Sequence, residues 1–345
     1  MRHTLMLYIL FFSLLVVEIQ TALADDNPQQ AQAVKLDDFN LSGYINVVGE
    51  APSGGISSLS LDDLSLFAIG HINKAVNPFI EAEISGFTLW QNGEAPFSGG
   101  GPQYSLERIY NDSYLTKNLS LRIGKMFSPV GEWNVIHAPP LVLTTTRPMT
   151  TLRGFSGYTS GVALIYSDAK SAVPDIQIYV QPAGELRPTP TSRATRGYEH
   201  VAGFHLNFPF GLNDKLGLSF QHAQIQNTDS QQNLIGFNFS KELGPMEFES
   251  EAIHTHFSDA DDDMLQSNEW GAYLQGAYAV RENWHLVGRF EYFVDRNSIL
   301  ASKNALFGIA YKTDSHAVWK IEYVNQFGQP LDIQTGIYAS FSMLF

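Results

Sequence analysis

The sequence predicts an all-β protein, a transmembrane antiparallel β-barrel of about 16 strands, and three observations predict it. Apolar and polar residues alternate along sixteen segments of about ten residues, which is the period of a strand with two different faces. The links between the segments tend to alternate between short and long. The last segment keeps its alternation up to Phe345, so its strand needs a partner, and a sheet that closes on itself supplies one.

The first segment of the chain has the features of a secretory signal peptide. Residues 1–24 contain an early basic residue, an apolar run over 5–17 and the small-residue pattern Ala22-Leu23-Ala24. The run is too short to span a bilayer, so we expect cleavage rather than anchoring. The mature protein is then a single barrel domain over 25–345, with a short periplasmic segment over 25–39.

Composition excludes several classes of protein. The 21 basic and 35 acidic residues give a net charge of −14, which argues against nucleic acid as a partner. The absence of cysteine excludes a disulfide framework. Outside residues 1–24 the sequence has no apolar run long enough for a transmembrane helix. We predict neither a cofactor nor a metal.

The sixteen segments follow one another without a domain linker. Their central residues are 41–49, 64–72, 79–87, 105–115, 119–127, 158–166, 175–181, 198–208, 215–225, 233–240, 246–254, 269–279, 284–294, 305–312, 317–324 and 333–345. A soluble β-sandwich also alternates, but this length would need two domains, and no change in composition divides the chain.

Link lengths indicate how the barrel is oriented. Links after even-numbered segments are short turns, such as 116–118, 211–214, 242–245 and 281–283. Links after odd-numbered segments tend to be longer, as over 50–63, 91–104, 128–157, 182–197 and 257–268. Outer-membrane barrels have short periplasmic turns and long outer loops, so we expect both termini on the periplasmic side.

Polar faces of the strands predict the lining of a lumen. Barrels of this size leave an aqueous channel, whereas smaller ones fill with side chains. The predicted lumen-lining residues are Glu81, Glu83, Glu247, Glu249, Glu251, Arg289, Glu291, Lys320 and Glu322. The opposite, apolar faces should contact lipid.

The carboxyl-terminal strand carries a predicted assembly signal. Phe341, Met343 and Phe345 share one face, which we expect to point at lipid while the strand pairs with the first one. A terminal aromatic residue after alternating apolar positions resembles the signal read by the machinery that inserts outer-membrane barrels. That machinery and outer-membrane lipid are therefore expected partners.

The link over 128–157 is the predicted constriction. Its middle is apolar and is stiffened by Pro139, Pro140 and Pro148, which favours packing against the barrel wall. The residues predicted at the constriction are Arg122, Glu132, His137, Arg147 and Arg153. Because bases outnumber acids there, in contrast to the lumen as a whole, we expect a weak preference for anions.

One motif carries a family resemblance. LRIGKMFSPVGEWN, with the spacing G-K-x-x-x-P-x-G from Gly124 to Gly131, resembles the phosphate-selective porin family and its porin-like relatives. The resemblance implies a sixteen-stranded, usually trimeric channel that passes small hydrophilic or ionic solutes and folds its third outer loop inward. Phosphate-selective members carry a ladder of basic residues, whereas the inward residues here include more acids than bases.

Other polar clusters admit two interpretations. Asp259–Asp263 is either a solvated loop or a divalent-cation site, and His254 with His256 is either a strand margin or part of a metal site. Arg187, Arg193 and Arg196 form either a solvated loop or a site for anions or lipopolysaccharide phosphates.

Two other classes of function stay open. An outer-membrane phospholipase or protease is one, although the sequence has no Gly-x-Ser-x-Gly motif. A non-conducting structural barrel or adhesin is the other.

Overall fold

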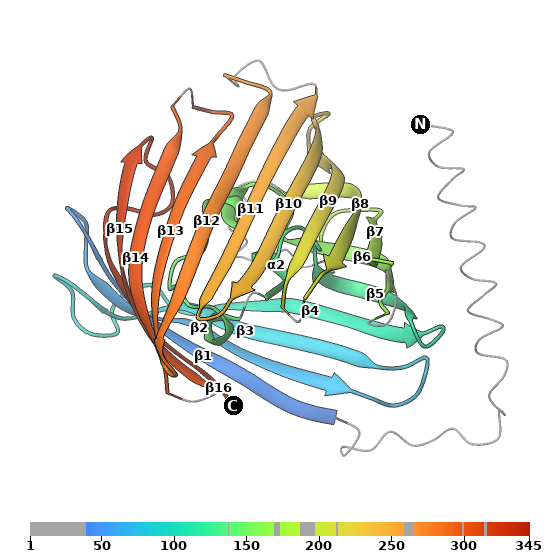
Figure 1. Cartoon of the computed structure of the whole chain (residues 1–345), viewed down its shortest axis with the longest axis horizontal. Coiled ribbons are helices and arrows are strands. Elements are labelled where there is room, and N and C mark those ends of the chain that lie inside the picture. The colour runs from blue at the N-terminus through green and yellow to red at the C-terminus, as the bar shows by residue number, and fades with distance from the viewer. Residues whose placement is uncertain are drawn as a thin grey trace.

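Sixteen antiparallel strands form one closed barrel in the computed structural model, in which β1 pairs with β16 (Figure 1). The structure describes residues 39–136, 138–168, 173–186, 197–211, 213–258, 265–298, 300–313 and 316–345. The predicted fold class and strand number are confirmed. Within the described residues, no helix has the length and apolar character needed to cross a membrane.

Strand bounds follow the predicted segments closely. The strands are β1 Phe39–Pro52, β2 Ser58–Gly70, β3 Pro78–Gln91, β4 Gln103–Tyr114, β5 Leu119–Phe127, β6 Tyr158–Tyr166, β7 Asp175–Gln181, β8 Tyr198–Pro209, β9 Lys215–Ile225, β10 Gln231–Leu243, β11 Met246–Ser258, β12 Asn268–Arg281, β13 Trp284–Val294, β14 Ser302–Lys312, β15 Ala317–Gly328 and β16 Gly336–Leu344. The link between β5 and β6 contains α2 Trp133–Ile136, η2 Pro139–Leu141 and α3 Met149–Arg153.

One predicted link is largely strand. β1 extends to Pro52 and β2 begins at Ser58, so the link expected over 50–63 shrinks to 53–57. The alternating residues on both sides of the turn continue the ladder, with Glu50 opposite Ser58. The last strand begins at Gly336 rather than at residue 333.

The barrel closes through the two terminal strands, as predicted. Tyr44 lies opposite Leu344, and Gly43 and Phe345 exchange two backbone hydrogen bonds of 2.9 Å. Gly43 is required by this close approach, because a Cβ there would lie 2.5 Å from the Ser65 carbonyl oxygen and 2.9 Å from the Phe345 ring. Closure therefore leaves no sheet edge unpaired.

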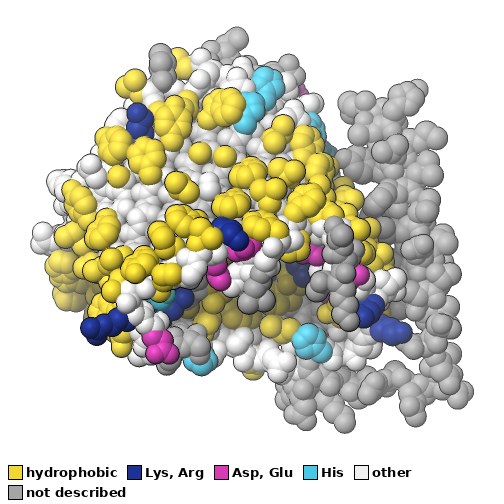
Figure 2. Space-filling model, viewed as in Figure 1, with side chains coloured by type: hydrophobic (Ala, Val, Ile, Leu, Met, Phe, Trp, Pro, Cys, Tyr) yellow, Lys and Arg dark blue, Asp and Glu magenta, His cyan; other side chains and the backbone are white. Residues whose placement is uncertain are grey.

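The outer face of the barrel is apolar. On β15 the side chains of Trp319, Ile321 and Tyr323 are about half exposed and alternate with the buried Lys320 and Glu322. Figure 2 shows hydrophobic side chains gathered over the strands, where charged side chains are sparse. This is the pattern of a barrel whose outer wall contacts lipid.

The β5–β6 link lies inside the barrel, where α2 appears in Figure 1. Val130, Met149 and Phe155 pack against Ile253 and Phe293 of the inner wall. Leu143 and Leu152 extend this packing to strands β12–β16, in clusters with Ala277, Val287, Ala310, Val318, Leu306, Val324 and Tyr338. Burying one such apolar side chain contributes about 1.5–3 kcal/mol, so packing holds the link against this side of the wall.

Candidate solute pathway

The two ends of the inner loop, residues 128–157, are clasped together. Ser128 N–H donates to the Gly157 carbonyl oxygen at 2.9 Å. The Asn134 side-chain amide donates to the carbonyl oxygens of Ser128, at 2.7 Å, and Gly157, at 3.0 Å. Gly131 has a φ of 69°, which suits glycine and turns the chain inward. The loop therefore leaves and re-enters the barrel wall at one place.

Three carboxylates of the wall hold the backbone of the inner loop. Glu251 accepts hydrogen bonds from Glu132 N–H and Trp133 N–H at 2.7 and 2.8 Å, at the start of α2. Glu291 accepts one from Met149 N–H at 2.7 Å, at the start of α3. These N–H groups have no partner within their own helices, so the carboxylates satisfy them.

Glu322 is the third carboxylate. Its two oxygens accept hydrogen bonds from Thr145 N–H at 2.9 Å and Thr146 N–H at 2.8 Å. Glu251, Glu291 and Glu322 come from β11, β13 and β15, and all three are at least 97% buried. The sequence predicted these three residues to line the lumen; in the structure they contact the inner loop.

Two buried bases complete the attachment. Arg289 donates to Glu291 at 2.7 Å, to the Thr144 hydroxyl at 2.9 Å and to the Thr146 carbonyl oxygen at 3.0 Å. Lys320 donates to the carbonyl oxygens of Pro139 at 2.8 Å and Thr144 at 3.2 Å. Five of the nine predicted lumen-lining residues therefore position the loop.

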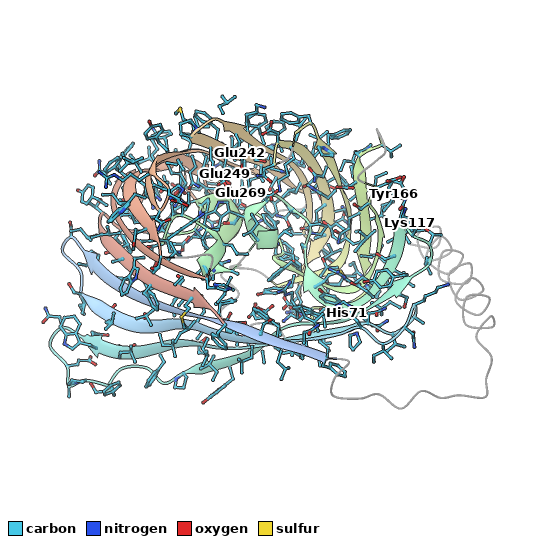
Figure 3. All side chains as sticks on the ribbon, turned by 60° about the horizontal axis from the view of Figure 1, so that its bottom comes forward. His71, Lys117, Tyr166, Glu242, Glu249 and Glu269 are labelled. Atoms are coloured by element: carbon cyan, nitrogen blue, oxygen red, sulfur yellow. The ribbon has the colours of Figure 1, made fainter. Side chains whose placement is uncertain are left out.

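The other four predicted lumen residues lie on two walls. Glu247 and Glu249 share the inner face of β11, and Glu249, labelled in Figure 3, accepts a hydrogen bond of 2.8 Å from Gln275. Glu81 and Glu83 are buried on the inner face of β3. Glu81 is paired with Arg108 and accepts a 2.7 Å hydrogen bond from Ser65.

The residues predicted at the constriction do not gather at one point. Arg122 is ion-paired with Asp112 on β4, at 2.7 Å, and Glu132 is paired with Lys215 on β9. Arg153 is bound to Asp332 at 2.6 Å, in the β15–β16 link, and to Asp295 at 3.1 Å, in the β13–β14 link. His137 lies outside the described residues.

Arg147 lines a cavity of about 520 Å³ between the inner loop and the wall of β1 and β2. Acids in its lining are Glu50, Asp62, Asp63 and Asp332, and Thr144–Thr146 with Trp133 form the loop side. Tyr338 of β16 and Asp332–Gln334 of the β15–β16 link also border the cavity, so it lies between the inner loop and the seam where β1 meets β16 and β2. This cavity is the candidate solute pathway.

Two β-bulges aim extra charges into the lumen. In β2, Asp63 lies opposite Asn46 and Leu61 opposite Val47, so Asp62 is an extra residue; its carboxylate accepts a 3.1 Å hydrogen bond from Asn46. In β4, Arg108 lies opposite Glu81 and Leu106 opposite Ala82, so Glu107 is the extra residue. Bulges re-aim side chains in this way. Two successive charges within or next to an alternating segment, as at 107–108 and 62–63, are the sequence signal that could have predicted them.

The remaining polar clusters lie elsewhere. The rings of His254 and Trp270 pack against each other in a tilted arrangement, with centroids 4.0 Å apart, and both His254 and His256 contact Asn268. Among the described residues, no group of three His, Asp or Glu is arranged to hold a metal ion. Asp259–Asp263 and the arginines at 187, 193 and 196 lie outside the described residues.

A closed barrel of sixteen strands with a loop folded into its lumen defines a porin-like architecture. No family model and no curated protein matches the chain. Its fold is similar to three solved structures at low sequence identity. They are OmpT of Vibrio cholerae in a trimer form (TM-score 0.62, 11% identity, covering 89% of this chain and 98% of that one), the anion-selective porin from Comamonas acidovorans (0.61, 11%, 89% and 99%) and Salmonella typhi OmpF in complex with daunomycin (0.63, 11%, 90% and 99%).

Proposed function

We propose that the protein is an outer-membrane porin, a passive diffusion channel for small hydrophilic or ionic solutes. The observation that carries this proposal is the cavity of about 520 Å³ beside an anchored inner loop, inside a closed barrel with an apolar outer face. The similarity of the fold to OmpT and OmpF supports it. The signal peptide expected over 1–24 supports export through the inner membrane.

Small charged and polar solutes fit this channel, but selectivity for phosphate does not. Three bases of the inner wall, Arg108, Arg122 and Lys125, are ion-paired with Glu81, Asp112 and Glu185 respectively. Their charges are therefore balanced in place. A ladder of basic residues that could strip a phosphate of water would need uncompensated charges.

Assembly partners follow from the same proposal. A homotrimer is supported by the trimer form of OmpT, whose fold this chain shares. Phe345 is 55% exposed on the outer face at the end of β16, which supports its role in the signal for barrel assembly. The outer face would contact lipid and, at its outer rim, lipopolysaccharide.

The test is conductance of purified protein in planar bilayers, together with swelling of protein-containing liposomes in solutes of graded size. We expect stepwise openings and a size cut-off, and heat-denatured protein is the control. Absence of both would overturn the proposal. Phospholipase or protease activity without conductance would favour the enzyme, and inertness in every assay would favour a structural barrel or adhesin.

A further inference from the structure

The inner wall opposite the anchored loop is an acidic surface built by strands β2–β4. Asp62, Asp63, Glu83 and Glu107 lie on it, in addition to the Glu81–Arg108 ion pair. Arg147 reaches this surface from the loop, and its charge acts on both Glu83 and Glu107; Lys125 of β5 also acts on Glu107. Asp62 and Asp63 line the open cavity beside Arg147, whereas Glu83 and Glu107 are buried in the neighbouring wall.

The cross-strand register places these acids opposite hydroxyl side chains, which makes the surface a patch rich in oxygen atoms. Asp63 lies directly opposite Ser85, and Glu83 lies opposite both Ser65 and Ser105. Every side chain in these two rows offers oxygen atoms, the donors that bind hard cations. The two β-bulges enrich the patch further, because Asp62 and Glu107 would be absent from it in regular strands.

Buried oxygen atoms without a partner give a second, independent indication of a ligand. The Tyr44 hydroxyl is fully buried, and the Ser85 hydroxyl and Glu83 carboxylate belong to side chains at least 96% buried. Among the described residues, Tyr44 Oη, Ser85 Oγ and Glu83 Oε2 have no hydrogen-bond partner. The acids that act electrostatically on Tyr44 are Asp63, Glu83 and Glu81, so its hydroxyl belongs to the same patch. Unpaired buried oxygen atoms are costly, and a cation bound at the patch would satisfy them.

We propose that the channel prefers monovalent cations, inorganic or alkylammonium, and that the patch of Asp62, Asp63, Glu83 and Glu107 binds their positive charge beside Arg147. This inference rests on the proposed channel function and names its solute class. The low-dielectric walls focus the field of the acids across the open side of the lumen. Binding must stay weak, since a solute that enters a channel also has to leave it. This proposal differs from the weak anion preference that the sequence led us to expect.

Reversal potentials across a KCl gradient and across an ethanolammonium chloride gradient test the proposal. We expect cation over chloride permeability in the wild type. The double variant Asp62→Asn, Asp63→Asn should lower that ratio by about threefold or more, as loss of focused charge requires. Arg147→Gln should raise it. Glu282→Gln, which removes an exposed acid from the short link after β12, is the matched control and should leave it unchanged.

The outcomes separate this inference from the channel function. A conducting wild type that prefers chloride, or a ratio that neither the aspartate pair nor Glu83→Gln changes, overturns the cation patch and leaves the channel intact. Glu83→Gln keeps the test decisive if the double variant fails to assemble. A wild type without any conductance overturns the channel itself. Equal effects in both salts assign the patch to cations in general, and an effect confined to ethanolammonium would restrict it to organic ammonium groups.

Discussion

Glu322 and Thr145 join the barrel wall to its inner loop: the buried carboxylate on β15 accepts the Thr145 N–H at 2.9 Å and the adjacent Thr146 N–H at 2.8 Å. The contact bonds a charged acceptor to two backbone donors that no helix or strand satisfies. Together with Glu251 and Glu291 it fixes the loop at three points along alternate strands. A loop held in this way defines one wall of the pathway rather than moving through it.

Glu322→Gln should loosen the loop. The glutamine amide keeps one acceptor oxygen but places an NH2 donor against one of the two loop N–H groups. One charge-assisted hydrogen bond, worth about 1.5–3 kcal/mol, is therefore lost. We expect noisier openings and a larger mean single-channel conductance. Glu282→Gln serves again as the control, and unchanged traces would show that the carboxylate does not hold the loop.

A disulfide can test the position of the loop directly. The hydroxyl oxygens of Thr145 and Ser340 lie 3.1 Å apart, which brings the side chains close enough for a disulfide, and the natural chain contains no cysteine. Thr145→Cys with Ser340→Cys should therefore cross-link in mild oxidant and conduct like the wild type. The cross-link can be followed by a mobility change that reductant reverses.

A matched pair controls for random collision. Thr145→Cys with Glu282→Cys places one cysteine in the loop and the other in a short link at the far end of the barrel. This pair should stay reduced under the same conditions. If the first pair also stays reduced, the loop does not lie against β16.

The turn between β8 and β9 should be sensitive to acid. Asp214 accepts a 2.8 Å hydrogen bond from Glu242 N–H and is paired with Lys241, and these contacts lower the pKa of its carboxyl group. A carboxyl group whose pKa is lower in the folded state stabilises the fold at pH values above the ordinary aspartate pKa. This stabilisation is lost as the pH falls below about 4 and through the pKa of the folded state. Asp214→Asn should therefore weaken the dependence of the unfolding midpoint on pH in that range, without changing the slope near neutral pH.

The sequence predicted the features of the fold that depend on local periodicity, namely strand bounds and barrel closure. The bounds of β5, β9 and β13 are the predicted ones, and β1 pairs with β16 as expected, because alternation and closure are properties of neighbouring residues and of the sheet. Arg289 and Glu291 were placed on the inner face for the same reason.

The contacts of the loop could not be predicted in this way. Glu251 meets Trp133 across 118 residues, and nothing in either segment specifies the other. Arg153 was assigned to the constriction, but its partners are Asp295 and Asp332, which lie in two different links between strands. Long-range pairing of charges is set by the closed barrel and by loop packing, which only the three-dimensional structure shows.

Shortening or changing the carboxyl terminus should impair assembly at the barrel seam. Phe345 contributes two of the hydrogen bonds that join β16 to β1, and its ring lies over Gly43. Phe345→Ser keeps the backbone bonds but removes the aromatic contact and the apolar end of the predicted assembly signal. We expect less heat-modifiable protein in the outer membrane and a larger fraction degraded or aggregated.

Gly43→Val separates the seam from the signal. This change leaves the carboxyl terminus intact but places side-chain atoms where the Ser65 carbonyl oxygen and the Phe345 ring already lie. If the seam matters, Gly43→Val should lower the thermal stability of the assembled barrel, whereas Phe345→Ser should lower the amount that is assembled. Normal surface abundance of Phe345→Ser would show that the terminal aromatic residue is no assembly signal in this chain. Unchanged stability of Gly43→Val would show that the seam tolerates a side chain there.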